Sequence, residues 1–132
     1  MNLESIISVS GEQGLFNLVA SRNNGLVLEH LESGKSKFYS VRKHQFTPLG
    51  TVAIYTLTDT KPLQDVFETM LKQVGDNPPV DVKSETINIE EYFESILPDY
   101  DEDRVSLKDM KKVIKWFNIL NNKGLLSAQE EE

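Results

Sequence analysis

The acidic segment ahead of the last predicted helix has the residue spacing that comes nearest to a site for chemistry. Asp99, Asp101 and Asp103 occupy alternate positions, as carboxylates do at the start of a calcium-binding EF-hand loop. Such a loop also needs glycine at its sixth position and a bidentate glutamate at its twelfth. Those positions hold Arg104 and Met110, so the match fails where the loop must turn and where the ion must be enclosed.

We therefore interpret this segment as a polar turn between helices. Its carboxylates would favour the N-terminus of the next helix, because free N–H groups and the helix dipole attract negative charge there. Three alternatives stay open. They are weak cation binding, docking of a partner protein, and catalysis by a carboxylate held in a cleft with a raised pKa.

The rest of the chain contains no recognisable catalytic or cofactor motif. The absence of cysteine excludes disulfides, thiolate catalysis and thiolate metal ligands. His30 and His44 lie 14 residues apart, and the sequence points to no third ligand or catalytic partner for them. Two glycines in the segment 10–14 satisfy neither of the common phosphate-binding patterns. The sequence therefore predicts a protein that is not an enzyme and that holds no cofactor or metal.

Charge is spread unevenly along the chain, whose net charge is −7. Residues 1–60 contain five basic and five acidic side chains, so this part is neutral. The remaining residues contain nine basic and sixteen acidic side chains and account for the whole net charge. Because broad nucleic-acid binding depends on neutralising phosphates, this balance argues against it, although a local basic surface is compatible with it.

Two groups of basic residues are the candidate partner-binding residues. The first group lies near predicted strand ends and loops and consists of Arg22, Arg42, Lys43 and His44. The second group lies opposite the apolar face of the last predicted helix and consists of Lys108, Lys111, Lys112 and Lys115. Trp116 widens that apolar face, which suggests a further internal neighbour or a dimer contact. The alternative for both basic groups is an ordinary solvated surface.

The N-terminal part of the chain is typical of short strands separated by turns. Asn23-Asn24-Gly25 predicts one turn, because Asn and Gly tolerate positive φ, and Ser33-Gly34 predicts another. The turns are so closely spaced that we expect a small SH3-like β-barrel or a strongly bent antiparallel sheet. The predicted strands are Ile6–Ser10, Leu15–Ser21, Leu26–Leu31, Ser36–Val41 and Val52–Leu57.

The C-terminal part changes to a helical period, with apolar residues three and four positions apart. Ser106 and Asp109 have the spacing of a capping box at the start of the last helix. Gly124 is placed to end it in the left-handed conformation, and Asn88 to cap the helix before it. The three predicted helices are Pro62–Val74, Ile89–Leu97 and the segment from Ser106 to Gly124, with a linker around Pro78-Pro79.

Several segments resemble an uncharacterised bacterial family of domains of unknown function. The resemblance spans about Asn2 to Leu120 and implies a β-rich N-terminal domain followed by a helical one. It implies no activity and transfers no catalytic residue. The segments are Ile6–Gly11, Gly14–Phe16, Gly25–Glu29, Ile54–Thr56, Leu97–Val105 and the last helix with Asp109, Lys111, Lys112 and Trp116.

Together these patterns predict an α+β protein with a β-rich domain over 1–58, a helical domain over 61–126 and an acidic tail over 127–132. We expect a non-enzymatic binding or adaptor protein that acts through protein–protein contacts with an unknown protein partner. The alternative is a nucleic-acid-associated protein that uses the barrel loops and the lysines of the last helix. No segment approaches the roughly 20 apolar residues that span a bilayer, and the N-terminus does not resemble a secretion signal. We therefore expect a cytoplasmic protein.

Overall fold

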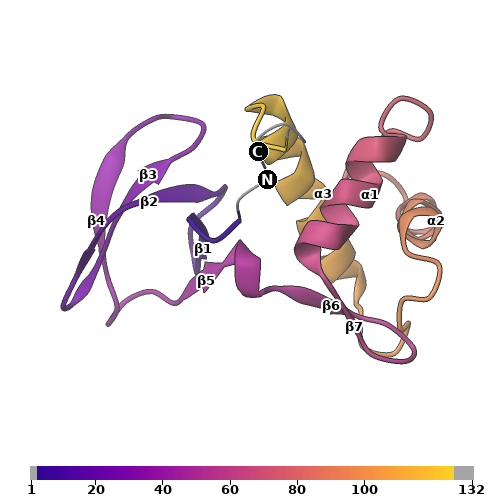
Figure 1. Cartoon of the computed structure of the whole chain (residues 1–132), viewed down its shortest axis with the longest axis horizontal. Coiled ribbons are helices and arrows are strands. Elements are labelled where there is room, and N and C mark those ends of the chain that lie inside the picture. The colour runs from indigo at the N-terminus through magenta and orange to yellow at the C-terminus, as the bar shows by residue number, and fades with distance from the viewer. Residues whose placement is uncertain (1–2, 127–132) are drawn as a thin grey trace. The chain divides into compact units, whose positions relative to one another are not determined.

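The chain divides into two compact units, one up to Val52 and one from Ala53 onward. The computed structural model describes residues 3–126. The first unit is built on an antiparallel sheet and the second on three helices, which confirms the predicted α+β class (Figure 1). The division falls after Val52, whereas the predicted N-terminal domain extended to residue 58. The predicted acidic tail, 127–132, lies outside the described residues.

The first unit is a five-stranded antiparallel sheet with the strand order β4-β3-β2-β1-β5. A single 3₁₀ turn, η1, follows the last of these strands. The bounds are β1 Ile6–Val9, β2 Phe16–Arg22, β3 Gly25–His30, β4 Ser36–Ser40, β5 Phe46–Pro48 and η1 Leu49–Thr51.

This sheet is antiparallel and open, so the predicted SH3-like barrel is wrong, and the antiparallel sheet named as its alternative is the one observed. A barrel requires every strand to pair on both sides, but β4 and β5 form the two edges of the sheet. The strand predicted over 52–57 was expected to belong to this domain. It forms instead β6, Ala53–Tyr55, which pairs with β7, Thr60–Pro62, in a separate two-stranded sheet of the second unit.

One face of the five-stranded sheet carries the apolar core of the first unit. Side chains alternate between the faces of a strand, so every second residue reaches this core. Phe16 and Tyr39 stack edge to face, with ring centroids 5.4 Å apart. The buried core residues are Ile7, Val9, Phe16, Leu28 and Tyr39, and Leu18, Leu26 and Phe46 pack against them.

Gly25 is required for a different reason from the one that the sequence suggested. The hairpin between β2 and β3 turns at Asn23 and Asn24, and no non-glycine residue of the described chain has a positive φ. Gly25 is the first residue of β3 and lies close against the neighbouring strand β4. A Cβ there would overlap the carbonyl oxygen of Tyr39 and lie 2.7 Å from the Phe38 ring. The close approach of strands, rather than the turn, excludes a side chain.

The second unit combines the hairpin of β6 and β7 with three helices that pack together (Figure 1). The helices are α1 Leu63–Gln73, α2 Thr86–Ile96 and α3 Leu107–Asn122. Phe67 of α1 and Phe117 of α3 lie in the core with ring centroids 5.9 Å apart. The helix faces predicted from the apolar spacing are the buried ones: α2, for example, buries Ile89, Tyr92, Phe93 and Ile96.

The caps of α3 are as predicted. The Ser106 hydroxyl accepts from the backbone N–H of Asp109, and the Asp109 carboxylate accepts from the backbone N–H of Ser106. Gly124 has a φ of 72°, and the Leu125 N–H donates to the Leu120 carbonyl at 2.9 Å in a Schellman motif.

The cap predicted for α2 is wrong. The helix begins at Thr86 instead of Ile89, with Glu85 at the N-cap position and no side-chain cap. Asn88 therefore lies inside the first turn. None of the helices in the described part of the chain is long and apolar enough to cross a membrane.

Candidate functional site

The acidic segment 99–103 is held in place by the hairpin of the second unit. Thr56, just after β6, forms an isolated antiparallel bridge with Tyr100. The Leu57 N–H donates to the Asp99 carbonyl at 2.9 Å, and the Asp101 N–H donates to the Tyr55 carbonyl at the same distance. The segment therefore extends the hairpin sheet through its backbone, and this leaves Tyr100 in a fixed position.

The three aspartates of this segment do different things and do not converge on one point. The Asp101 carboxylate accepts from the Asp103 N–H at 2.9 Å and lies 3.6 Å from the Arg104 guanidinium, so it closes the turn. Asp99 and Asp103 are exposed. Within residues 3–126, no group of three His, Cys, Asp or Glu side chains is arranged to hold a metal ion. The geometry agrees with a polar turn.

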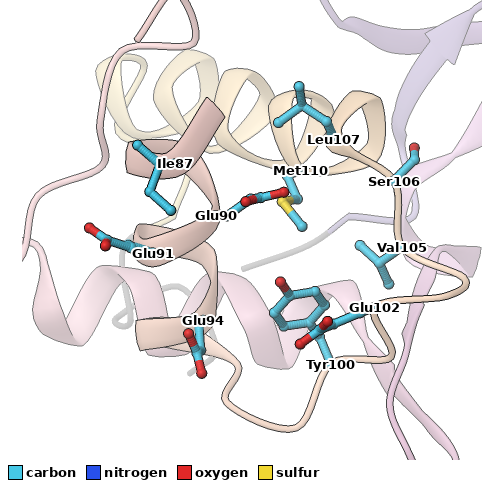
Figure 2. Close-up of a pocket in the computed structure, with 10 residues that line it drawn as sticks. All are labelled: Ile87, Glu90, Glu91, Glu94, Tyr100, Glu102, Val105, Ser106, Leu107 and Met110. Carbon is cyan, nitrogen blue, oxygen red and sulfur yellow. The ribbon is translucent and has the colours of Figure 1, made fainter. Parts of the chain in front are cut away.

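A pocket of about 400 Å³ lies beside this turn, between α2 and the first turn of α3 (Figure 2). The capping box sets the position of α3 here, and the backbone bridge to β6 sets that of Tyr100. The pocket is lined by Ile87, Glu90, Glu91, Glu94, Tyr100, Glu102, Val105, Ser106, Leu107 and Met110.

The apolar part of the pocket comes from both helices and the turn. Val105 and Met110 are buried and form its inner wall, and Leu107 is half-buried. Ile87, in the first turn of α2, is 55% exposed, which is high for a large aliphatic side chain. The pocket therefore offers a ligand apolar surface that is accessible to solvent.

The acidic part of the pocket surrounds Tyr100. Burial raises the pKa of the Tyr100 hydroxyl, and the negative charges of Glu102, Glu90 and Glu94 raise it further. Figure 2 shows Glu90 reaching from α2 towards the side of Met110 and the Tyr100 hydroxyl pointing into the same space, whereas Glu91 points away from it. The four glutamates that line the pocket thus produce a negative potential over its partly apolar surface.

This arrangement suits a cation that has an apolar stem. The carboxylates accept charge-assisted hydrogen bonds from an ammonium or guanidinium group, and the apolar wall can cover a chain of methylene groups. The Tyr100 ring adds an aromatic edge that already packs against Phe93, with ring centroids 5.2 Å apart. Lysine and arginine side chains combine these two properties.

The lysines singled out in the sequence lie on α3 but do not line this pocket. Lys108, Lys112 and Lys115 are exposed, and Lys111 is half-buried. Trp116 is half-buried on the same helix. The structure thus keeps the lysines on one side of α3 and places the acidic pocket at its N-terminal end.

The basic residues singled out in the first unit lie at the end of β2 and in the segment after β4, which the structure brings to one end of the sheet. The Val41 N–H donates to the Asn24 carbonyl at 3.0 Å, so the turn after Arg22 lies beside the one that carries Arg42 and Lys43. All three side chains are exposed. His44 is instead half-buried, with its Nδ1 atom 3.2 Å from the Ser10 carbonyl and its ring 5.3 Å from that of Tyr39.

Of the residues that line the acidic pocket, the sequence singled out the acidic segment that contains Tyr100 and Glu102, but not the glutamates of α2. The sequence did contain one indication of an acidic surface, because α2 contains three glutamates and no lysine or arginine. The predicted helix began at Ile89, so Ile87 lay ahead of it and its exposed position on a helix was not predicted. The approach of Glu102 and Tyr100 to α2 depends on the bridge to β6, which joins residues distant in sequence.

Comparisons with known proteins agree with the division into two units. A family model described as Domain of unknown function (DUF6852) matches residues 52–120, and one described as Domain of unknown function (DUF5606) matches residues 3–49. A protein from Bacteroides vulgatus whose solution NMR structure is known is 32% identical, with a TM-score of 0.75. The match covers 94% of this chain and 89% of that one.

A comparison with curated proteins found no match. The descriptions of the matching families assign no activity. The resemblance noted in the sequence is confirmed, because a domain-of-unknown-function model matches each of the two parts. The chain therefore belongs to the DUF6852 family, and its residues 3–49 match the DUF5606 model.

Proposed function

We propose that this protein is a non-enzymatic binding protein of the bacterial cytoplasm that acts through protein–protein contacts. Its acidic pocket would take a lysine- or arginine-bearing segment of a partner protein. The observation that carries the proposal is the pocket beside α2, where exposed apolar surface and four glutamates occur together. The absence of cysteine suits a reducing compartment.

The chemistry of the pocket favours a side chain over a free metal ion. Figure 2 shows Glu90 directed towards Met110 and Glu94 directed away from the Tyr100 ring, so the carboxylates do not face one point, which suits several N–H donors and a long stem. Burying the stem against Ile87 and Met110 adds hydrophobic stabilisation of about 25 cal/mol per Å² of apolar surface. Charge attraction alone at exposed carboxylates contributes little, so the apolar contact is needed for affinity.

The test is the binding of a dye-labelled amphipathic peptide of lysine and leucine, measured by fluorescence anisotropy. We expect the peptide to bind, and raising the salt from about 50 to about 300 mM to weaken binding, because salt screens exposed charges. The Glu90→Gln/Glu94→Gln variant should bind at least about 5-fold more weakly, since it loses two charged acceptors.

Two controls separate the pocket from overall charge. The Asp65→Asn/Glu68→Gln variant removes the same charge from α1, outside the pocket, and should bind within about 2-fold of the wild type. The same peptide with glutamate in place of lysine should not bind. Equal binding by wild type and the α2 variant, or equal losses in both variants, would exclude this pocket as the binding site.

The nucleic-acid alternative has one structural observation in its favour. The hydrogen bond between Val41 and Asn24 brings Arg22 to the same end of the sheet as Arg42 and Lys43. Phosphate contacts need such a cluster of exposed cations. The net charge of −7 opposes it, so we keep protein binding as the proposed function.

A further inference from the structure

β4 is an edge strand whose outward backbone groups can be assigned from its pairing with β3. The His30 N–H donates to the Lys35 carbonyl at 2.9 Å, and the Val41 N–H donates to the Asn24 carbonyl at 3.0 Å. In an antiparallel ladder the hydrogen-bonded residues alternate, so Lys37 and Tyr39 direct their backbone groups towards β3. The backbone groups of Ser36 and Phe38 therefore point away from the sheet.

The surroundings of this edge are open. Ser36, Lys37 and Phe38 are exposed, and Phe38 is 42% exposed. Among the described strands, β4 pairs with β3 alone and forms the outer edge of the sheet (Figure 1). Proteins usually shorten, twist or cover such edges, because unpaired N–H and C=O groups accept a further strand.

A pocket of about 470 Å³ adjoins β4 on the core side of the sheet. Its aromatic part is formed by Phe16, His30 and Tyr39, with the Phe16 ring centroid 5.0 Å from that of His30. The His30 ring is fixed, because its Nδ1 accepts from the Ser33 N–H at 3.1 Å and its Nε2 lies 3.2 Å from the Gln13 carbonyl. Lys35 and Lys37 also line this pocket.

β4 and the residues on either side of it carry positive charge, whereas Glu29 of β3 pairs with Ser36 on the inner side of the strand. Residues 35–43 contain Lys35, Lys37, Arg42 and Lys43 and no acidic residue. The Lys37 ammonium lies 5.5 Å from the centre of the Tyr39 ring. Glu12 is the one acidic residue that lines the pocket, so the two lysines outnumber it. Lysine on an edge strand repels an identical edge, but the same charge attracts an acidic strand.

We propose that β4 binds an extended acidic segment of a partner protein, which adds to the sheet as a further strand. The main chain of that segment would bond to the outward backbone groups of Ser36 and Phe38. Its alternate side chains would then meet Lys37 and the adjoining pocket on one side and Phe38 on the other. This site lies in the first unit and is independent of the acidic pocket proposed above.

The experiment uses a dye-labelled peptide of alternating glutamate and valine with the full-length protein. We expect binding by fluorescence anisotropy and shifts of the Ser36 and Phe38 amide signals in ¹H–¹⁵N spectra. A peptide with the same side chains and N-methylated backbone amides should not bind, because it cannot pair with a strand edge. Lys35→Gln/Lys37→Gln should weaken binding at least about 5-fold.

Ser36→Pro separates strand addition from simple charge attraction. Proline is tolerated at the first residue of an edge strand, and the Ser36 N–H does not bond to β3, so the sheet should persist in the amide spectrum. We expect this variant to bind at least about 5-fold more weakly, since it loses an outward donor. Equal binding by Ser36→Pro and wild type, or equal binding of the N-methylated peptide, would overturn the proposal.

A short single-stranded oligonucleotide serves as the competing polyanion. We expect it to displace the peptide poorly. If it binds as tightly as the peptide and loses affinity in the lysine variant but not in Ser36→Pro, the edge is a basic surface and not a strand acceptor. That outcome would also overturn the proposal.

Discussion

Tyr92 of α2 fills part of the core of the second unit with its ring and also places an unpaired hydroxyl there. Its ring is buried among the helices, but its hydroxyl is also buried and makes no hydrogen bond to the residues that the structure describes. A buried polar group without a partner costs free energy that a hydrocarbon of the same shape would not. We therefore expect Tyr92→Phe to leave the free energy of unfolding unchanged or to raise it by about 1 kcal/mol in urea titrations.

The same hydroxyl predicts a loss of stability at high pH. Burial raises the pKa of Tyr92 from the ordinary value of 10.0 to about 12. The folded state therefore holds this proton more tightly than the unfolded state does, and the resulting stability is complete below pH 10. It is lost as the pH rises from 10 through 12, by up to about 2 kcal/mol.

Urea titrations of wild type and Tyr92→Phe over this pH range isolate the effect. Lysines and other tyrosines titrate equally in both proteins, so the difference between the two curves reports Tyr92. The wild-type free energy of unfolding should fall more steeply with pH than that of the variant. Parallel curves would show that the hydroxyl is hydrated in the folded state.

Gly25 is the second residue whose identity depends on a tertiary contact. An added methyl group would overlap the Tyr39 carbonyl oxygen, so β3 and β4 would have to separate. We expect Gly25→Ala to lower the free energy of unfolding by about 1–3 kcal/mol. Gly75→Ala is the matched control, because nothing lies within 4 Å of its added methyl group and its φ is not positive. The control should change stability by less than about 1 kcal/mol.

At the level of elements, α3 carries its own start and stop signals, whereas α2 depends on its neighbours. The capping box at Ser106 and the left-handed Gly124 use residues within a few positions of the helix ends. Such local patterns can be predicted from sequence, and both predictions are confirmed. α2 begins without a side-chain cap, so no local pattern marks its first turn. Its start at Thr86 exposes Ile87 and thereby completes the acidic pocket.

Removal of the N-cap side chain should lower the free energy of unfolding more at α3 than at α2. Ser106→Ala removes the acceptor of the Asp109 N–H and should lower the free energy of unfolding by about 1 kcal/mol. Glu85→Ala removes a side chain that makes no cap and should cost less than about 0.5 kcal/mol. Urea denaturation followed by far-ultraviolet circular dichroism measures both. If Ser106→Ala lost as little stability as is expected for Glu85→Ala, the capping box would add little to the stability of α3.

At the scale of the whole molecule, the net charge distinguishes the proposed protein binding from the nucleic-acid alternative. The net charge of −7 opposes the binding of nucleic acid, although the first unit carries basic residues at the end of β2, on β4 and in the turn after β4. We expect the protein to pass through a heparin column at about 50 mM salt, with a basic protein of similar size as the column control. Retention that collapses with added salt would favour the nucleic-acid alternative.

The sequence by itself determined the features that depend on near neighbours along the chain. These are the α+β class, the apolar faces of the three helices, and the caps at Ser106 and Gly124. A helix face repeats every three to four residues, and a cap is completed within a few positions, so both can be recognised without any long-range contact.

Only the tertiary structure decided which strands pair and which side chains meet. The strand over 53–55 has the same β-forming composition as its predecessors, but it pairs with β7 and leaves the five-stranded sheet open. The pocket forms only where Tyr100 and Glu102 lie close to α2, and the bridge between Tyr100 and Thr56 holds their turn in that position. Strand partners and converging side chains are chosen by contacts between distant residues, and local residue patterns do not specify those contacts.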